Sequence, residues 1–254
     1  MTPFEVVAIL LAGCAAGTIN TVVGSGTLIT FPTLLAFGVP PVTANVSNTV
    51  GLVPGSLSGV LGYRAELTGQ RSRLLRLGSA SLIGSTIGAL LLLVLPSEAF
   101  DAIVPALVGL GVLLVVLGPR ISRAVAARAE SRGGLPDHGP AWVWPAILVM
   151  GVYGGYFGAA QGVLLMAVLG IGVADTLQRH NATKNVLALV VNAVAALIFV
   201  AVADVDWAVA GLIAVGSVIG GQIGATVGRR LSPSLLRGVI VVVGLSALVA
   251  LLLG

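Results

Sequence analysis

Charged residues are scarce in this sequence, and their scarcity excludes an ordinary soluble domain. They make up 9% of the 254 residues, whereas 57% of the residues are hydrophobic and the mean hydropathy is +1.10. An average soluble domain carries about 25% charged residues. The few charges lie in short intervals, and the apolar stretches between them approach the ~20 residues that a helix needs to cross a bilayer. We therefore predict an all-α integral membrane protein in a lipid bilayer, with no additional soluble domain.

Cysteine and histidine are also rare, which limits the chemistry open to the chain. Cys14 is the single cysteine, so it can form neither an intramolecular disulfide nor a thiolate metal cluster. His138 lies in a linker, His180 lies near a membrane boundary, and no acidic residue falls clearly inside an apolar stretch. A membrane enzyme would need such groups to converge within the bilayer. We therefore expect no enzyme, no cofactor and no metal site, and keep a membrane enzyme only as a less favoured alternative.

An internal repeat divides the chain into two halves. The segment SLIGSTIGA begins at Ser81 and SVIGGQIGA begins at Ser217, and they agree at six of nine positions with an offset of 136. The same offset aligns residues 45–49 with residues 181–185, and it also aligns the two glycine-containing breaks described below. Separate matches at one offset indicate a duplicated structural unit.

Each half contains five apolar elements, of which the second is short. We take residues 1–118 and 141–254 as the two membrane repeats. Residues 119–140 form a basic cytoplasmic linker, which we expect to be a disordered connection rather than a regulatory segment. The first apolar run lacks the basic leading region of a secretory signal, so we expect it to be a membrane helix. The predicted elements cover residues 3–22, 27–37, 43–63, 73–95 and 99–117, and then 142–158, 162–172, 177–203, 207–228 and 234–253.

The charges of the connections predict the orientation of the chain. Basic residues follow the third, fifth and ninth elements and precede the eighth, whereas connections at the opposite membrane face carry only acidic residues. Because cytoplasmic loops are enriched in Lys and Arg, we expect both termini outside and the linker in the cytoplasm. The same rule accounts for a pI of about 10.0, so we expect no nucleic acid as a partner. Equivalent loops then lie on opposite sides, as in the inverted-topology repeats of many secondary transporters.

Each short element follows a glycine-containing break in the apolar sequence. An element of about 11 residues spans roughly half of the hydrocarbon core, so its N-terminus must lie near the membrane centre. A helix N-terminus carries unpaired N–H groups and a partial positive charge, which favour an anion. We therefore expect broken or re-entrant helices that form a central binding site, rather than glycines that serve only close packing. The expected donors and close-approach glycines are Asn20, Gly24, Ser25, Gly26, Thr27, Gln161 and Gly162.

A polar stripe runs along the third and eighth elements, and its positions correspond under the repeat. Side chains at spacings of three, four, seven and eight fall on one helical face, which predicts a lined pathway. For Lys184, the only lysine, we weigh equally a role in attracting an anion and a position at the cytoplasmic end, where its ammonium would reach the lipid headgroups. The stripe comprises Asn45, Asn48, Thr49 and Ser56, matched by Asn181, Lys184, Asn185 and Asn192.

A family resemblance covers nearly the whole chain and rests on two segments, GTINTVVGSGTLITFPTLLAFGVPPVTANVSNTVGL and GGYFGAAQGVLLMAVLGIGVADTLQRHNATKNVL. Their order of a glycine-rich break, a short helix, a proline-containing turn and Ala-Asn-x-Ser resembles the sulfite exporter TauE/SafE family, also called the toluene sulfonate uptake permeases. The resemblance implies a bacterial or archaeal cytoplasmic-membrane carrier of sulfite, sulfonates or sulfoacetate. By motif position it points to Asn20, Gly24, Ser25, Gly26, Asn45, Asn48, Gln161, Gly162, Asn181 and Lys184.

We accordingly predict a secondary transporter of small sulfur-containing organic or inorganic anions, with its site at mid-membrane between the repeats. A passive anion channel would have the same lined path and stays an alternative, whereas a structural scaffold would not require paired central breaks. Since no carboxylate or histidine lies inside the bundle, we expect facilitated transport or proton linkage through the substrate's own acid–base equilibrium. Sodium bound by backbone carbonyls at the breaks stays open. The sequence is compatible with a homodimer and identifies neither the anion nor the direction of transport.

Overall fold

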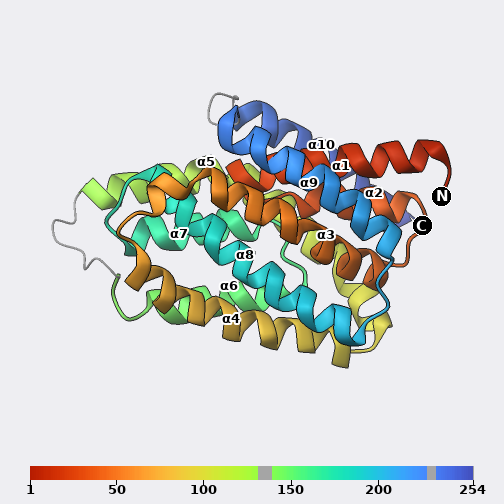
Figure 1. Cartoon of the computed structure of the whole chain (residues 1–254), viewed down its shortest axis with the longest axis horizontal. Helices are drawn as coiled ribbons and strands as arrows, with labels where there is room; N and C mark the ends of the chain where they lie inside the picture. Colours follow the sequence, from red (N-terminus) through yellow and green to blue (C-terminus); the bar gives the residue numbers. More distant parts are fainter. Residues whose placement is uncertain (131–138, 228–232, 254) are drawn as a thin grey trace.

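Ten α-helices and one 3₁₀ helix form the part of the chain that this computed structural model describes, residues 1–130, 139–227 and 233–253 (Figure 1). No strand occurs among these residues, so the prediction of an all-α protein is confirmed. The elements are α1 (Pro3–Val22), α2 (Thr27–Ala36), α3 (Pro41–Gly62), η1 (Arg64–Leu67), α4 (Arg71–Val94), α5 (Ser97–Glu130), α6 (Val143–Tyr156), α7 (Gln161–Gly172), α8 (Leu177–Val202), α9 (Trp207–Thr226) and α10 (Pro233–Leu253).

Apolar runs predicted the positions of the helices closely, with one exception. Nine of the ten α-helices begin and end within two residues of the predicted elements. The exception is α5, which continues through Pro119 to Glu130 instead of ending near residue 117. Proline removes one backbone hydrogen bond, but the segment that follows is rich in Ala and Arg, which favour a helix. The prediction of a disordered connection was therefore wrong for residues 119–130, and His138 lies outside the described residues.

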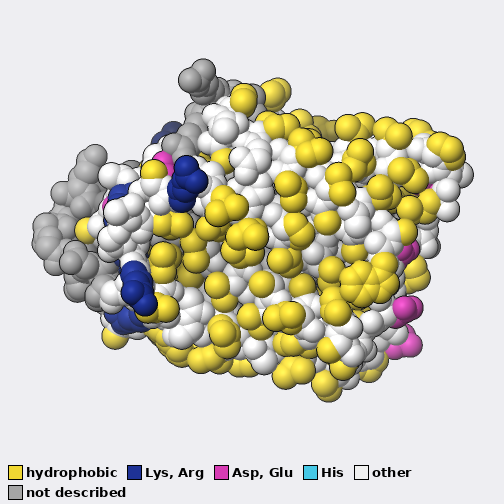
Figure 2. All heavy atoms as spheres, in the orientation of Figure 1, with side chains coloured by type: hydrophobic (Ala, Val, Ile, Leu, Met, Phe, Trp, Pro, Cys, Tyr) yellow, Lys and Arg dark blue, Asp and Glu magenta, His cyan; other side chains and the backbone are white. Residues whose placement is uncertain are grey.

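Six helices are long and apolar enough to cross a bilayer: α1, α4, α8, α9, and the larger parts of α5 and α10. The helices α2, α6 and α7 are too short, with 10, 14 and 12 residues. Helix α3 has 22 residues, but it is rich in buried polar side chains and is not among the six. On the face shown in Figure 2, apolar side chains cover most of the surface between the two ends of the molecule, as a lipid-facing surface requires. The chain is therefore a multi-pass membrane protein.

The two ends of the molecule differ in charge. On the face shown in Figure 2, the Lys and Arg side chains gather at one end, together with a few Asp and Glu side chains, whereas the charged side chains at the opposite end are Asp and Glu. Both chain termini lie at the acidic end, whereas α5 ends and α4 begins at the basic end (Figure 1). This separation agrees with the loop charges on which the predicted orientation rests. Which end faces the cytoplasm stays a prediction.

Two helical hairpins enter the molecule from opposite ends and meet near its middle. Helix α1 runs in from the end that holds the chain termini, and α2 turns back toward that end (Figure 1). Helices α6 and α7 form the corresponding hairpin from the basic end (Figure 1). At the tips, the backbone N–H of Gly162 donates to the carbonyl of Gly24 at 3.0 Å. Neither short helix crosses the molecule, and the two breaks meet as predicted.

Glycines let each half pack closely against the other. Helix α1 packs on α9 and α4 packs on α6, so each pair joins helices from different halves. A Cβ atom added at Gly220 would lie 1.9 Å from the carbonyl oxygen of Cys14, and one added at Gly88 would lie 2.1 Å from that of Val152. Small residues at such crossings allow the close approach of helix backbones. The two pairs correspond under the repeat, although the inverted-repeat relation itself stays a prediction.

Candidate functional site

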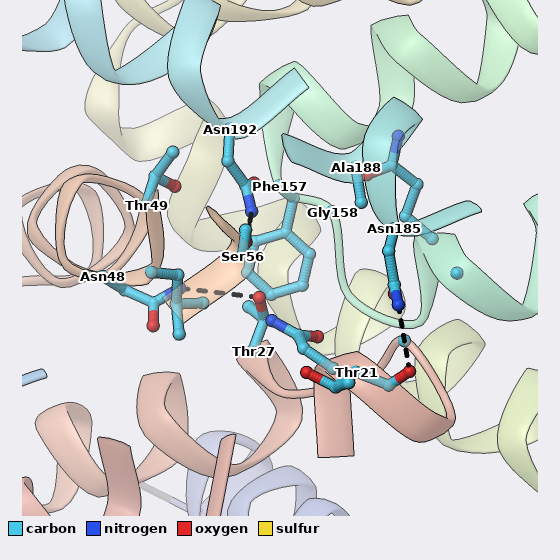
Figure 3. A pocket seen from close by; sticks show the side chains of 15 residues that line it. Thr21, Thr27, Asn48, Thr49, Ser56, Phe157, Gly158, Asn185, Ala188 and Asn192 are labelled. Carbon is cyan, nitrogen blue, oxygen red and sulfur yellow. Dashed lines mark hydrogen bonds between the residues drawn. The ribbon is translucent and has the colours of Figure 1, made fainter. Parts of the chain in front are cut away.

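A small cavity lies where the two hairpin tips meet α3 and α8 (Figure 3). Its volume is about 30 Å³, which is room for roughly two water molecules. Every residue that lines it is uncharged. The lining consists of Asn20, Thr21, Gly24 and Thr27 from the first hairpin, Asn48, Thr49, Leu52 and Ser56 from α3, Phe157, Gly158, Gln161 and Gly162 from the second hairpin, and Asn185, Ala188 and Asn192 from α8.

Eight of the thirteen predicted site residues line this cavity: Asn20, Gly24, Thr27, Asn48, Gln161, Gly162, Asn185 and Asn192. The other five, Ser25, Gly26, Asn45, Asn181 and Lys184, are not among the lining residues. They belong to the same breaks and to the same turns of α3 and α8. The structure thus brings residues from four separated segments to one place, while their role in binding stays a prediction.

Four lining residues lie outside the predicted stripe and break segments. Thr21 and Phe157 stand just before the two breaks and are related by the offset of 136. Leu52 and Ala188 are related by the same offset and lie on the same helical faces as the stripes, between Asn48 and Ser56 and between Lys184 and Asn192. The helical period would have identified Leu52 and Ala188, which the polar pattern passed over because they are apolar. Thr21 follows Asn20 directly, and extending the second break by one residue would have added Phe157.

The first break is closed by hydrogen bonds within its own hairpin. Gly24 has a left-handed backbone, with φ of +88°. The side-chain oxygen of Asn20 accepts from the backbone N–H of Gly26 at 2.7 Å, at the start of α2. The Ser25 hydroxyl is buried, and it has no hydrogen-bond partner in the part of the chain that the structure describes. Asn20 therefore fixes the bend in the chain, and the hydroxyl of Ser25 is a donor without an acceptor.

The second break differs from the first in how its N–H groups are used. Gly158 and Ala160 have φ of +77° and +58°. The Gln161 side chain donates to the carbonyl of Met150 at 3.0 Å, and the backbone N–H of Gly162 donates to Gly24. The N–H of Gly162 is thus satisfied by the opposite tip. The sequence predicted that the N–H groups at both helix N-termini would be free to bind an anion. In this conformation the N–H of Gly162 is not free.

The polar stripes of α3 and α8 face one another across the cavity (Figure 3). The Asn192 side chain donates to the hydroxyl of Ser56 at 3.1 Å, which joins two positions that correspond under the repeat. Asn48 accepts from the hydroxyl of Thr30 and donates to that of Thr27 at 3.5 Å. These amides and hydroxyls are neutral, and each can both donate and accept a hydrogen bond. Their side chains can therefore exchange the present partners for a ligand.

Lys184 is fully buried and holds the end of α1. Its side chain is 0% exposed, and its Nζ donates to the carbonyls of Asn20 at 2.9 Å and Thr21 at 3.3 Å. Asn181 and Asn185 also donate to the Thr21 carbonyl, at 3.1 and 3.4 Å. The last carbonyls of a helix lack intrahelical partners and carry a partial negative charge, which a cation stabilises. The alternative in which the Lys184 ammonium reaches the lipid headgroups is therefore wrong.

A side chain of the first half also binds the C-terminal end of a helix in the second half, as Lys184 does for α1. The side chain of Asn45 in α3 donates to the carbonyl of Tyr156, the last residue of α6, at 2.9 Å. Under the repeat, Asn45 corresponds to Asn181. Asn45 and Asn181 therefore act on the helix ends beside the cavity and do not line it, which the sequence pattern could not distinguish.

A separate ionic cluster lies at the basic end and joins the start of α4 to the connection between α7 and α8. The Arg73 guanidinium lies 2.6 Å from one carboxylate oxygen of Asp175, and that of Arg179 lies 2.8 Å from the other. Burial by itself raises the pKa of the Asp175 carboxyl. Hydrogen bonds from Arg73, the backbone N–H of Thr176 and Arg179 outweigh burial, and the pKa is lower than its ordinary value. The carboxylate therefore stays ionised at neutral pH.

Comparison with known proteins gives matches over almost the whole chain. The sequence profile of the family described as "Sulfite exporter TauE/SafE" matches residues 9–251. The "Probable membrane transporter protein YfcA" of Escherichia coli K12 is 26% identical over 251 residues, which cover 96% of this chain and 88% of the relative. The "Probable membrane transporter protein ORF9" of a Sinorhizobium species is 27% identical over 258 residues, covering 98% and 93%. A "Probable membrane transporter protein" of Haemophilus influenzae is 24% identical, covering 94% and 91%.

Proposed function

The chain belongs to the sulfite exporter TauE/SafE family of membrane transporters, and from this premise we propose that it is a secondary transporter of small sulfur-containing anions of the sulfite, sulfonate or sulfoacetate type. The proposed binding site is the cavity between the two hairpin tips. One observation carries the proposal: Lys184 is fully buried beside this cavity and makes no ion pair in the described part of the chain.

A buried ammonium needs compensation, and an anion in the cavity would supply it. Burying an unpaired charge costs several kcal/mol even after the protein relaxes, by order of magnitude. The carbonyls of Asn20 and Thr21 offset part of this cost because they are dipoles, but they bring no net negative charge. An oxyanion bound beside them would be a counter-ion to Lys184. The amides of Asn48 and Asn192 would donate hydrogen bonds to its oxygens.

Binding would require the hairpin tips to separate. The cavity of about 30 Å³ has room for roughly two water molecules, and a sulfonate with an organic group is larger than that. The hydrogen bond from the Gly162 N–H to the Gly24 carbonyl joins the two tips at the edge of the cavity's lining. One hairpin enters from each end of the molecule (Figure 1), so movement of either hairpin would open the cavity toward its own side. This is the alternating access that transporters built from two halves use.

Counterflow in proteoliposomes tests the carrier against a passive anion channel. For a carrier, unlabelled sulfonate loaded inside should accelerate the uptake of labelled sulfonate, because loaded sites return faster than empty ones. No trans-stimulation, together with rapid uptake, would favour the channel.

The cavity is tested by filling it. Asn192→Leu should reduce uptake at least tenfold, because it removes a donor and occupies the space between α3 and α8. Leu197→Ala changes a side chain that is 73% exposed on the same helix, and should leave uptake unchanged. Equal uptake by both variants would show that the site lies elsewhere.

A further inference from the structure

The cavity is surrounded by neutral groups, with one exception. All 15 lining residues are uncharged. Within the described ranges, Lys184 is the one charged side chain that hydrogen-bonds to the lining, through the carbonyls of Asn20 and Thr21. Asn185, the next residue in α8, donates to the same Thr21 carbonyl and lines the cavity directly (Figure 3).

No described carboxylate balances this charge. Asp175, the nearest acidic residue along the described sequence, is paired with Arg73 and Arg179 at the basic end. A charge in a low-dielectric interior is stabilised by an opposite charge far more than by dipoles. When Lys184 is protonated, the site thus holds a single positive charge that no described carboxylate balances. The other acidic residues in the described segments lie at or near the ends of helices: Glu5, Glu66, Glu98, Asp101, Glu130, Asp204 and Asp206.

The number of charges on the ligand then matters as much as its shape. A ligand with one negative charge would make the site neutral overall. A ligand with two would leave one negative charge in the same buried place, with only amides, hydroxyls and dipoles to stabilise it. Because burial penalises an uncompensated charge of either sign, the second charge should weaken binding.

We infer that this site selects monoanions, and that Lys184 determines this specificity. The ligand class is tetrahedral or pyramidal oxyanions with one negative charge: simple sulfonates, and sulfite in its singly protonated form. Doubly charged sulfite, sulfate and sulfoacetate are disfavoured. The inference rests on the proposed function and narrows its substrate class.

Competition by a matched pair of ligands tests the inference with the unaltered protein. Methanesulfonate and methylphosphonate have nearly the same size and shape, but methylphosphonate loses a second proton near neutral pH. Uptake of labelled methanesulfonate is measured roughly one unit below and one unit above that second pKa. Methylphosphonate should compete up to about tenfold more weakly at the higher pH, because the fraction of its monoanion falls about tenfold over this interval. Unlabelled methanesulfonate, a monoanion throughout, corrects for any effect of pH on the protein. Equal competition at both pH values would overturn the inference.

A second cation placed opposite Lys184 should reverse the preference. Asn48 occupies the position in α3 that corresponds to Lys184 under the repeat, and it lines the cavity. In Asn48→Lys, competition by the methylphosphonate dianion relative to the monoanion should improve at least tenfold over Asn48→Met, a control of similar length without charge. No difference between the two variants would contradict a selection by charge.

Failure of this inference can be distinguished from failure of the proposed site. If Asn192→Leu blocks uptake but mono- and dianions compete equally in the wild type, the proposed site is supported and the selection by charge is wrong. If Asn192→Leu leaves methanesulfonate uptake unchanged, the proposed site is wrong, and the selection by charge at that site is wrong as well.

Discussion

At the scale of residues, backbone space decides how closely the hairpin tips approach. Gly24 has a left-handed backbone, and a Cβ atom on it would lie 2.4 Å from the Cα atom of Gly162. In the second half the corresponding residue is Ala160, which is left-handed and buried but has a Cβ atom. The conformation therefore tolerates alanine where space allows, and the first break requires glycine because the opposite tip occupies that space.

Gly24→Ala should destabilise the protein and abolish transport. The left-handed conformation and the displaced tip together should cost about 2–4 kcal/mol of unfolding free energy. Thermal unfolding in detergent and uptake of labelled sulfonate are the measurements. Gly211→Ala is the matched control, since a Cβ atom there meets nothing within 4 Å in helix α9, and it should be neutral or stabilise by about 0.5–1 kcal/mol. Equal unfolding temperatures for the two variants would contradict the tight contact of the tips.

The sequence predicted the helical face on which Lys184 lies, but not the groups that it contacts. The helical period placed it on the polar face of α8 together with Asn185 and Asn192. Its partner is the carbonyl of Asn20, 164 residues away. That contact depends on where α1 ends relative to α8, which is a property of the packed structure. The pattern could therefore identify the face, but not which residues line the cavity and which hold a helix end.

At the scale of elements, the breaks and apolar runs were sufficient to predict the helices and the shortness of α2 and α7. The ionic cluster at the basic end was not predictable, because Arg73 at the start of α4 and Asp175 in the connection between α7 and α8 are 102 residues apart. In the sequence, Arg73 is one of several basic residues beside a span. The structure places it 2.6 Å from Asp175, with both side chains at most 10% exposed. The cluster ties the start of α4 in the first half to the start of α8 and the connection before it in the second half.

Asp175→Asn should weaken this tie between the halves. It leaves two guanidinium groups without their carboxylate, and we expect a loss of about 2–4 kcal/mol in unfolding free energy. Asp204→Asn changes an exposed acid at the opposite end, so it should alter stability by less than about 0.5 kcal/mol. Thermal unfolding of both variants beside the wild type gives the comparison. A loss in Asp204→Asn as large as that in Asp175→Asn would show that the cluster has no special role.

The same cluster predicts how stability depends on pH. The pKa of Asp175 is lower in the folded protein than its ordinary value. Its contribution is therefore fully present above the unfolded pKa of about 3.9 and is lost as pH falls through the lower folded value. The wild type should lose unfolding temperature on acidification below about pH 4, and Asp175→Asn should lose less. Parallel acid profiles for the two proteins would contradict the stabilised carboxylate.

At the scale of the whole molecule, the separation of charges predicts orientation in the membrane. The basic end should face the cytoplasm and the acidic end, with both termini, should face outside. Single cysteines at Ser97 and Arg123, both exposed, would mark the two ends in a chain in which Cys14 is replaced by Ala. An impermeant thiol reagent added to intact cells should label the first and not the second. The reverse labelling would invert the topology.

The positions of all charges together predict how transport is energised. A proton-driven carrier commonly has a carboxylate or histidine inside its bundle, whereas the described acidic residues and His180, in the first turn of α8, lie near helix ends. A sodium site at the first break would need carbonyls such as those of Asn20 and Thr21, but the ammonium of Lys184 already binds both. We therefore expect transport down the substrate and voltage gradients, independent of sodium, with any proton linkage arising from the substrate's own acid–base equilibrium.

The test is uptake of a fully ionised sulfonate into sealed liposomes with voltage clamped and sodium absent. A pH gradient should then drive no accumulation, and adding sodium should change nothing. Uphill accumulation driven by pH would require a proton site on the protein, and its loss on neutralising one acidic residue would identify that site.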